Sequence, residues 1–263
     1  MSRHGILAEI IEHKRAETRA LKAVRPLAAV RRDAEDASPA RPFAERLATD
    51  RPAVIAEIKK ASPSEGVIRE DFDPQTIATD YASAKASCLS VLTDERFFQG
   101  DDAHLVAARA ACTLPVLRKD FIVDEYQVYE TRALGADCLL LIVAALEPSQ
   151  LADLNGLAQD IGLDVLIEAH DRAELQQALA LGPRIVGINN RDLATFTTRL
   201  ETTLDLLDDM PDDVGVVTES GIHTPQDVCR MIDAGVNAFL VGTAFMREAS
   251  PGAALQRLFG WAA

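Results

Sequence analysis

Charged side chains close a series of short apolar runs along this chain of 263 residues. One run ends in Glu57 and Lys59, which are two positions apart and would point to the same side of a strand. Other runs end in Lys119, in Glu168 and in Glu219. A buried charge without a partner costs free energy, so these groups must face one another, water or a ligand. Lysines and glutamates gathered in one place could carry out acid–base catalysis.

Small residues and hydroxyl groups follow the last two runs. Ser220-Gly221 lies after the seventh run and Gly242-Thr243 after the eighth. Backbone amides and hydroxyls at such positions bind phosphate in many parallel barrels. Thr224-Pro225 then has the pattern of a helix N-cap with proline at the first helical position. These segments predict a phosphate site in front of a helix.

The elements that must position these groups alternate regularly. Short runs rich in β-branched residues alternate with longer segments of helical period, at the spacing of strand–helix units. Glycine comes before three of the runs, at Gly135, Gly182 and Gly235, where a left-handed residue can end a helix. The eight runs are residues 53–59, 87–93, 114–119, 137–142, 164–168, 184–189, 214–219 and 238–241.

Eight strands that alternate with helices favour parallel pairing and right-handed crossovers. We therefore predict an α/β fold, a (β/α)8 TIM barrel with an N-terminal helical extension, and an active site at the carboxyl ends of the strands. An open doubly wound sheet is the alternative. Such a sheet usually has a glycine-rich nucleotide loop after its first strand, and the chain contains no G-x-G-x-x-G motif.

The first part of the chain is predicted to be helical. Ile6, Leu7, Ile10 and Ile11 recur at helical spacing, and Arg25-Pro26 ends this amphipathic helix. A polar stretch then leads to a short second helix near residues 43–49. We expect residues 1–263 to form one domain, with residues 1–50 as an extension over the barrel mouth and residues 51–263 as the barrel. The chain ends directly after the eighth helix, so no second catalytic domain is expected.

Composition narrows the possible partners. The net charge is −14, from 41 acidic and 27 basic residues, which disfavours binding to nucleic acid. No apolar run approaches the roughly 20 residues of a membrane span, and the N-terminus lacks the apolar core of a secretory signal. The four cysteines are widely spaced, as expected for free thiols, and the five histidines lack the spacing of metal ligands. These features predict a cytoplasmic protein without a bound metal.

Five strings, in order along the chain, resemble the motifs of the indole-3-glycerol-phosphate synthase family. The similarity runs from the first helix to the end of the barrel, and the five strings together are very specific. They are residues 57–66 (EIKKASPSEG), 90–94 (SVLTD, followed by Phe97 and Gly100), 114–121 (LPVLRKDF), 187–193 (GINNRDL) and 219–222 (ESGI).

The resemblance implies a reaction of tryptophan biosynthesis. Its substrate would be 1-(2-carboxyphenylamino)-1-deoxyribulose 5-phosphate, and its products indole-3-glycerol phosphate, CO2 and water. No metal and no organic cofactor are implied. The partner is thus a phosphorylated small molecule. We expect a monomer, while a weak association with other enzymes of the pathway stays open.

The resemblance also implies roles for four charged residues. Lys119 would be the general acid that protonates the substrate ketone, and Glu168 would transfer a proton as the hydroxyl leaves. Lys59 would bind the carboxylate of the substrate and could donate a proton during dehydration, with Glu57 beside it. Which lysine acts at which step stays open, because groups that share one cavity can set each other's protonation states.

The remaining site residues are expected to bind and orient the substrate. Asn189, counted among the catalytic set, and Arg191 would position the intermediate, while Phe97 and Phe121 would pack against the aromatic ring. The others are Ser62 as a further substrate-binding residue, Glu219 and Ser220 on the sugar side, and Gly221, Gly242 and Thr243 at the phosphate.

Three further expectations concern single residues. A lysine with like charge nearby and a low dielectric around it has its pKa lowered toward working pH, and we expect this of the catalytic lysine. His170 follows Glu168 by two positions, and a surface or hydrogen-bonded role is favoured over a catalytic one. The sequence departs from the family where Ala84-Lys85-Ala86 stands before the second strand in place of a common glycine, and where Thr243 replaces a frequent serine.

Two other functions fit the barrel less well. A Schiff-base aldolase would use Lys119 or Lys59 as its nucleophile and would form a covalent adduct that borohydride traps. A non-catalytic barrel that binds a partner enzyme is the second alternative. It is disfavoured because a scaffold has no need of two lysines and two glutamates at the strand ends.

Overall fold

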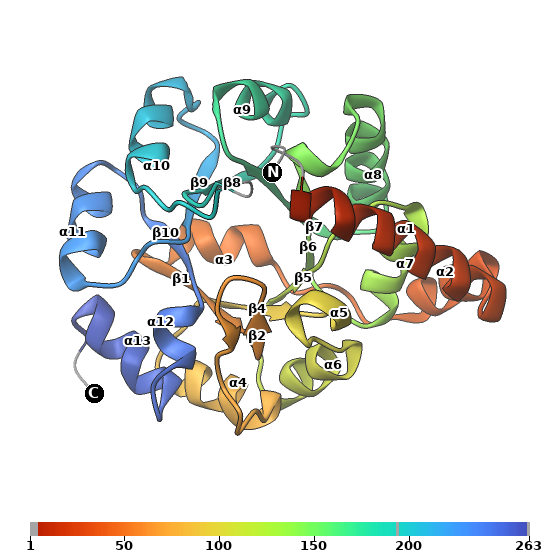
Figure 1. The fold of residues 1–263 in the computed structure, drawn as a ribbon, viewed down its shortest axis with the longest axis horizontal. Coiled ribbons are helices and arrows are strands. Elements are labelled where there is room, and N and C mark those ends of the chain that lie inside the picture. The colour runs from red at the N-terminus through yellow and green to blue at the C-terminus, as the bar shows by residue number, and fades with distance from the viewer. Residues whose placement is uncertain (1–4, 193–194, 262–263) are drawn as a thin grey trace.

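The computed structural model describes residues 5–192 and 195–261; Leu193, which ends the fourth of the five strings, lies outside them. Eight parallel strands form a closed barrel in the order β1-β10-β9-β8-β7-β6-β5-β4, with helices around it (Figure 1). This confirms the predicted fold class and all eight strands. The strands are β1 Ala53–Ile58, β4 Cys88–Leu92, β5 Val116–Lys119, β6 Cys138–Ile142, β7 Asp164–Ala169, β8 Ile185–Asn189, β9 Gly215–Glu219 and β10 Ala238–Val241.

Helices follow each barrel strand and cover the outside of the barrel. The covering helices are α4 Pro74–Ser83, α6 Asp102–Ala111, α7 Glu125–Ala133, α8 Pro148–Asp160, α9 Arg172–Leu179, α10 Glu201–Leu206, α11 Pro225–Asp233 and α13 Pro251–Phe259. Shorter elements lie in the loops: the hairpin of β2 Ala61–Ser62 and β3 Gly66–Val67, helices α5 Glu95–Phe98 and α12 Thr243–Met246, and the 3-10 turns η1 Val143–Ala145 and η2 Leu207–Asp209.

Local sequence explains where the helices begin and end. Thr224 caps α11 through a capping box with Asp227, as the Thr-Pro pattern predicts. Gly135, Gly182 and Gly235 have positive φ angles of 86°, 63° and 95°, which confirms their expected place at the turn from a helix back to a strand. These turns are short and return the chain to the amino-terminal end of the barrel.

Strand residues are buried on both faces, as the continuous apolar runs predict. All six residues of β1 are buried. Side chains alternate between the barrel interior and the helix layer, and adjacent charged residues on one strand therefore reach different surroundings. Arg118 on β5 points into the helix layer, where it lies 3.0 Å from Asp102 and 2.9 Å from Glu130. Lys119 points instead toward the carboxyl end of the barrel interior.

The N-terminal extension is divided between the two ends of the barrel. Helix α1, Gly5–Val24, crosses the carboxyl end of the strands (Figure 1), and Leu7 and Ile10 on it line the pocket there. Helix α3, Phe43–Thr49, packs at the opposite end, where the Ala44 amide donates a hydrogen bond of 2.8 Å to Asp164 at the start of β7. Within residues 5–50, α1 thus lies at the carboxyl end of the strands and α3 at their amino-terminal end.

The stretch predicted to be polar and irregular contains a further helix, α2, Leu27–Asp36. Its apolar residues Val30 and Ala34 are buried against Tyr126 and Tyr129 of α7. Residues 27–36 contain few apolar side chains, most of them small, among charged neighbours. The apolar face of this helix is therefore hard to recognise from the sequence. Packing against α7 stabilises a helix that periodicity alone does not reveal.

A buried lysine holds α1 on the barrel. The Nζ atom of Lys14 lies 2.8 Å from Glu17 on the same helix, 3.0 Å from Asp94 and 3.0 Å from Asp120. Only 3% of the Lys14 side chain is exposed, and both aspartates are buried as well. Burial favours the neutral lysine, but the carboxylates outweigh it and hold the pKa of Lys14 above its ordinary value. The charge cluster thus ties α1 to the loops after β4 and β5.

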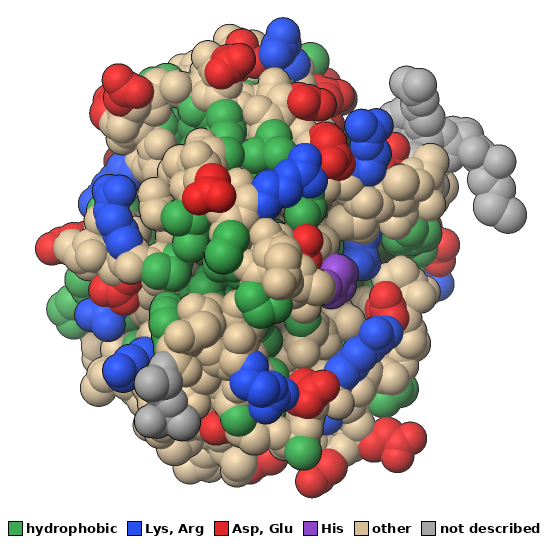
Figure 2. Space-filling model, turned by 90° about the vertical axis from the view of Figure 1, so that its left-hand side faces the viewer, with side chains coloured by type: hydrophobic (Ala, Val, Ile, Leu, Met, Phe, Trp, Pro, Cys, Tyr) green, Lys and Arg blue, Asp and Glu red, His purple; other side chains and the backbone are tan. Residues whose placement is uncertain are grey.

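Charged side chains of both signs are scattered over the face of the molecule seen in Figure 2. Within residues 5–192 and 195–261, no helix has the length and apolar character needed to cross a membrane.

Candidate active site

A pocket opens at the carboxyl end of the barrel, with a volume of about 1160 Å³ including its mouth. Its walls come from the ends of the strands, from the loop after β1 and from α1. Among the predicted site residues, the pocket is lined by Glu57, Lys59, Ser62, Lys119, Phe121, Glu168, Asn189, Arg191, Glu219, Ser220, Gly221, Gly242 and Thr243. The strand ends therefore bring together thirteen predicted residues that are far apart in the sequence.

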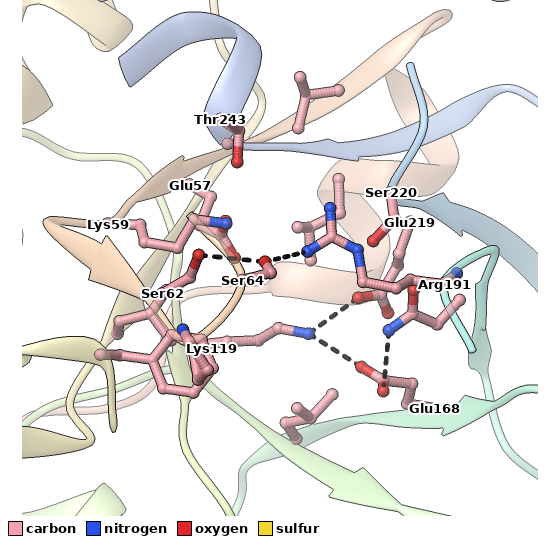
Figure 3. A pocket seen from close by; sticks show the side chains of 18 of the residues that line it. Glu57, Lys59, Ser62, Ser64, Lys119, Glu168, Arg191, Glu219, Ser220 and Thr243 are labelled. Carbon is pink, nitrogen blue, oxygen red and sulfur yellow. Dashed lines mark hydrogen bonds and ion pairs between the residues drawn. The ribbon is translucent and has the colours of Figure 1, made fainter. Parts of the chain in front are cut away.

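The centre of the pocket is an ion-paired cluster around Lys119 (Figure 3). Its Nζ atom lies 2.9 Å from Glu168 Oε2 and 2.8 Å from Glu219 Oε2. Asn189 donates a hydrogen bond of 3.1 Å to the other oxygen of Glu168. The two carboxylates are almost fully buried, with 3% and 2% of their side chains exposed. Pairing with Lys119 offsets part of the hydration free energy that these buried carboxylates lose.

The cluster holds its members in different protonation states. Burial lowers the pKa of Lys119, but Glu168 and Glu219 outweigh burial and raise it above the ordinary lysine value. Burial raises the pKa of Glu168, but Lys119 and His170 outweigh burial and lower it well below the ordinary value. Burial and the nearby Glu168 raise the pKa of Glu219 to about 7, against the opposing effect of Lys119. The ligand-free site thus holds an ammonium, a carboxylate and a carboxyl that titrates near neutrality.

This electrostatic result corrects the expected lysine pKa. The prediction assumed that like charge would surround the catalytic lysine and lower its pKa. Lys119 instead has carboxylates as its nearest charged neighbours, and opposite charge favours the ammonium form. The second lysine has its own partner, since Lys59 Nζ lies 2.6 Å from Glu57 Oε2.

Gly242 leaves room for the second ion pair. A Cβ atom at this position would collide with the carboxylate of Glu57. Gly187 on β8 likewise leaves room for the Glu219 side chain, because a Cβ atom there would collide with the Oε1 atom of that carboxylate. Both glycines are needed because a carboxylate occupies the space of their missing side chains.

Arg191 connects the end of β8 to the loop after β1. Its guanidinium donates a hydrogen bond of 3.0 Å to Ser64 Oγ, and Ser62 Oγ lies 3.4 Å from the same hydroxyl. The backbone amide of Arg191 donates to the Asn189 side chain at 3.0 Å. In Figure 3 the dashed lines from Ser62 through Ser64 to Arg191 run beside those of the Lys119 cluster.

The predicted phosphate-binding residues lie at one end of the pocket. Ser220 and Gly221 have positive φ angles of 64° and 84°, so the chain turns sharply after β9. Gly242 and Thr243 stand at the start of α12, directly after β10. Gly221 packs closely on Thr198 and Leu200, where a Cβ atom would approach Thr198 Cγ2 to 2.8 Å.

The structure separates the two phenylalanines that were predicted to pack against the aromatic ring. Phe121 lines the pocket, but Phe97 is not among the lining residues. The ring of Phe97 instead packs edge-on against His13 of α1, with centroids 5.8 Å apart. Phe98 takes the pocket position, and its ring centroid lies 6.1 Å from that of Phe121. The short helix α5 sets this orientation, and two adjacent phenylalanines in the sequence do not distinguish it.

Several residues of the site were not predicted. Leu7 and Ile10 from α1, together with Phe98, add apolar surface to the pocket, and Ser64 bonds to Arg191. The amphipathic stripe of the first helix was a usable signal for Leu7 and Ile10, because that face needed an apolar partner. Among the residues that the structure describes, no group of three or more histidine, cysteine, aspartate or glutamate side chains is arranged to hold a metal ion.

Solved structures with similar folds are barrels that differ greatly in sequence. The N-acetylmannosamine-6-phosphate 2-epimerase of Clostridium perfringens matches with a TM-score of 0.62 at 13% identity, over 84% of this chain and 96% of the other. The 3-hexulose-6-phosphate synthase of Salmonella typhimurium matches with a TM-score of 0.62 at 13% identity, over 78% of this chain and 96% of the other. At this identity the likeness supports the fold alone.

Sequence relatives are much closer. The indole-3-glycerol phosphate synthase of Laribacter hongkongensis is 57% identical over 97% of this chain and 98% of its own. The enzyme of that name from Chromobacterium violaceum is 58% identical over 97% of each chain. A family model described as indole-3-glycerol phosphate synthase matches residues 7–258. Because this match spans nearly all of the barrel and most of α1, the chain belongs to the indole-3-glycerol phosphate synthase family.

Proposed function

We propose that the pocket converts 1-(2-carboxyphenylamino)-1-deoxyribulose 5-phosphate to indole-3-glycerol phosphate, with release of CO2 and water, as a step of tryptophan biosynthesis. The observation that carries this proposal is the position of Lys119, whose ammonium group lies between the Glu168 and Glu219 carboxylates at the floor of the pocket. Such an arrangement supplies an acid and a base within one turnover.

Ring closure needs an acid at the substrate ketone. The aromatic carbon that bears the carboxylate attacks the ketone carbon, and the carbonyl oxygen becomes a hydroxyl by taking a proton. Lys119 is the donor, because its neighbours hold it in the ammonium form and a buried cation stabilises negative charge that develops on oxygen. Glu219 lies on the sugar side of this ammonium group.

Decarboxylation needs control of the substrate carboxylate. The bond from the ring to the carboxylate breaks, CO2 leaves, and its bonding electrons restore the aromatic ring. Lys59 is the binding group for this carboxylate, and Glu57, 2.6 Å from it, keeps the ammonium group in place. An ion pair that turns the carboxylate out of the ring plane favours loss of CO2, because the breaking bond then aligns with the ring π-system.

Dehydration completes the indole. A proton leaves the carbon next to the ring nitrogen, the hydroxyl departs as water, and the new double bond closes the aromatic system. Glu168 is the group that transfers the proton, since its low pKa supplies a carboxylate at neutral pH. Asn189, 3.1 Å from this carboxylate, orients it, and Lys59 is a candidate donor for the departing hydroxyl.

The ends of the substrate differ in chemistry, and so do the ends of the pocket. Gly221, Gly242, Thr243 and Ser220 offer backbone amides and hydroxyls for the phosphate. Phe121 and the unpredicted Phe98 offer apolar surface for the aromatic ring. Ser62 and Arg191 line the pocket between the phosphate end and the aromatic end, and Arg191 positions the intermediate.

The charge state of the lysine disfavours the aldolase alternative. A Schiff base forms by attack of a neutral amine on a carbonyl, whereas the two carboxylates hold Lys119 as an ammonium group. Lys59 is likewise paired with Glu57. Borohydride with a keto-sugar phosphate would trap an aldolase lysine, and we expect no adduct.

The decisive experiment is an indole-fluorescence assay with the carboxyphenylamino-deoxyribulose phosphate in the presence of EDTA. We expect turnover by the unaltered protein and a loss of about 10²–10⁴-fold in kcat for Lys119→Ala and for Glu168→Gln. Lys22→Ala, on the outer part of α1, is the matched control and should keep full activity. A folded, unaltered protein without turnover would exclude the proposed reaction.

Two further properties belong to the same proposal. The enzyme is expected to act in the cytoplasm, where its pathway supplies the substrate. It is also expected to act as a monomer, since the complete pocket is built from one chain. Sedimentation analysis at working concentration tests the second point.

A further inference from the structure

The side chain of His170, directly after β7, faces a carboxylate with each ring nitrogen. Its Nε2 atom lies 3.3 Å from Glu168 Oε1, and its Nδ1 atom lies 2.9 Å from Glu174 Oε2 on α9. Only 12% of the side chain is exposed. The imidazole is thus enclosed between the carboxylate proposed to transfer protons and one that belongs to the helix layer.

Three groups from three strands surround the Glu168 carboxylate. Lys119 from β5 lies 2.9 Å from Oε2, and Asn189 from β8 donates to Oε1 at 3.1 Å. His170, at the end of β7, approaches Oε1 as well but is not among the residues that line the pocket. It therefore approaches the carboxylate from outside the pocket lining, and we expect it to act through Glu168.

The ring contact is not needed to connect β7 to α9. The backbone amide of His170 already donates a hydrogen bond of 2.8 Å to Glu174 Oε2. The amide of Glu174 in turn donates to Asp171, the N-cap of α9. Hydrogen bonds from backbone amides therefore already stabilise the turn between β7 and α9. The imidazole adds an electrostatic contact from this turn to Glu168.

We propose that His170 is a positioning residue for the reaction: its imidazolium fixes the Glu168 carboxylate and keeps it ionised, while Glu174 orients and charges the imidazole. This inference rests on the proposed function of Glu168. It departs from the expectation of a merely surface or hydrogen-bonded histidine, because one of the two carboxylates beside the ring is the proton-transfer group itself.

The surroundings of the ring favour its charged form. Burial lowers the pKa of His170, but the carboxylates of Glu168 and Glu174 outweigh burial and raise it to about 10. The 3-10 turn η1, which packs against both β7 and α9, contains only valine and alanine and contributes no charge. On the far side of Glu168 from the imidazole, the next charged groups are Lys119, which pairs with Glu168, and Glu219, which pairs with Lys119.

His170→Asn tests the positioning role, since asparagine is neutral and still polar. Without the cation, the pKa of Glu168 rises from its strongly lowered value toward the ordinary glutamate value of about 4.3, so an acid limb that lies below the assay range in the unaltered enzyme should enter the kcat profile. We expect kcat at neutral pH to fall at least about tenfold, with KM changed less than about twofold, because the ring touches no substrate. Glu174→Gln, which keeps an acceptor but removes the charge, should give a smaller shift in the same direction.

His104→Asn is the matched control. This histidine packs on Phe72, with ring centroids 5.1 Å apart, and lies outside the pocket lining. Its pH profile should equal that of the unaltered enzyme. A folded His170→Asn variant whose kcat profile gains no acid limb would overturn the proposal, whether kcat is kept or lost, because a purely structural role would leave the pKa of Glu168 unchanged.

Histidine NMR separates this inference from the proposed function. In protein labelled with 15N-histidine, the signal that disappears in His170→Asn should remain that of an imidazolium through pH 8. Its pKa should fall by at least about one unit in Glu168→Gln and in Glu174→Gln. A neutral imidazole at pH 8 overturns the inference without any assay, whereas inactivity of the unaltered enzyme with a charged His170 counts only against the proposed reaction.

Discussion

The Nζ atom of Lys14 lies 3.0 Å from the Oδ1 atom of Asp120, the residue that follows Lys119 on the chain. The N-terminal helix is thereby tied to the strand end that carries the proposed acid. Asp120 also accepts a hydrogen bond of 2.6 Å from Thr93, at the end of the neighbouring strand. Docking of α1 and placement of Lys119 thus depend on one buried charge cluster.

Lys14→Met should therefore lower both stability and activity. Removing the cation takes the ion pair from buried Asp94 and leaves Asp120 with Arg118, 3.6 Å away, as its remaining cation; such a loss costs about 3–5 kcal/mol of unfolding free energy. A displaced α1 and strand end should reduce kcat/KM by about 10- to 100-fold. Urea unfolding and steady-state kinetics measure the two effects.

Lys22→Met on the same helix is the control for this variant. Lys22 pairs with Asp124, but the two side chains are 34% and 32% exposed. Exposed pairs contribute about 0–1 kcal/mol, so this variant should remain close to the unaltered protein in both measurements. Equal losses in the two variants would contradict a special role for the Lys14 cluster.

The pKa of Glu219, raised to about 7 by burial and by Glu168 against the effect of Lys119, predicts a pH dependence of substrate capture. Below pH 7 the carboxyl is neutral, and above pH 7 it adds a negative charge to the pocket. The proposed substrate carries a carboxylate and a phosphate, so kcat/KM should fall as pH rises through about 7. This profile reports the free enzyme.

Glu219→Gln tests the assignment, because the amide stays neutral across the range. The variant should lose the descending limb near pH 7, whatever its absolute activity. A limb of unchanged position in Glu219→Gln would assign the ionisation to another group, and measurements from pH 5.5 to 9 suffice to distinguish these results.

Gly242→Ala should damage the site without a large loss of stability. Its Cβ atom would meet the Glu57 carboxylate, which must then leave its position beside Lys59. We expect kcat/KM to fall at least about tenfold. Gly156→Ala in the middle of α8 is the control, since a Cβ atom there meets nothing within 4 Å. That control should raise the unfolding free energy by about 0.5–1 kcal/mol and leave the kinetics unchanged.

Lys85→Gly should stabilise the protein. Lys85 has a φ angle of 67° directly before β4, a conformation that costs a non-glycine residue about 1 kcal/mol or more. Relief of this strain should exceed the entropy cost of the added glycine and raise the unfolding free energy by about 0.5 kcal/mol. Thermal and urea unfolding measure the gain, and Lys85→Ala, which keeps a Cβ atom, should not show it.

The sequence by itself determined the eight barrel strands, the first helix and the kind of chemistry, but not helix α2. Apolar runs, the glycines between them and the residues that close each run are local features, and each follows from backbone geometry or side-chain burial at its own position. The carboxyl ends of parallel strands necessarily meet at one end of a barrel. For this reason Lys119, Glu168 and Glu219 could be assigned to one site before their contacts were known.

Tertiary structure decided which of these groups pair and in what charge state. Lys119 and Glu219 are 100 residues apart, and the pKa of each depends on the other and on the depth of burial. The expectation of a lowered lysine pKa failed because distance and sign of the nearest charges are properties of the closed barrel. In the same way, the packing of α5 selected Phe98 over Phe97. The pairing of His170 with Glu174 likewise exists only because α9 packs against the end of β7.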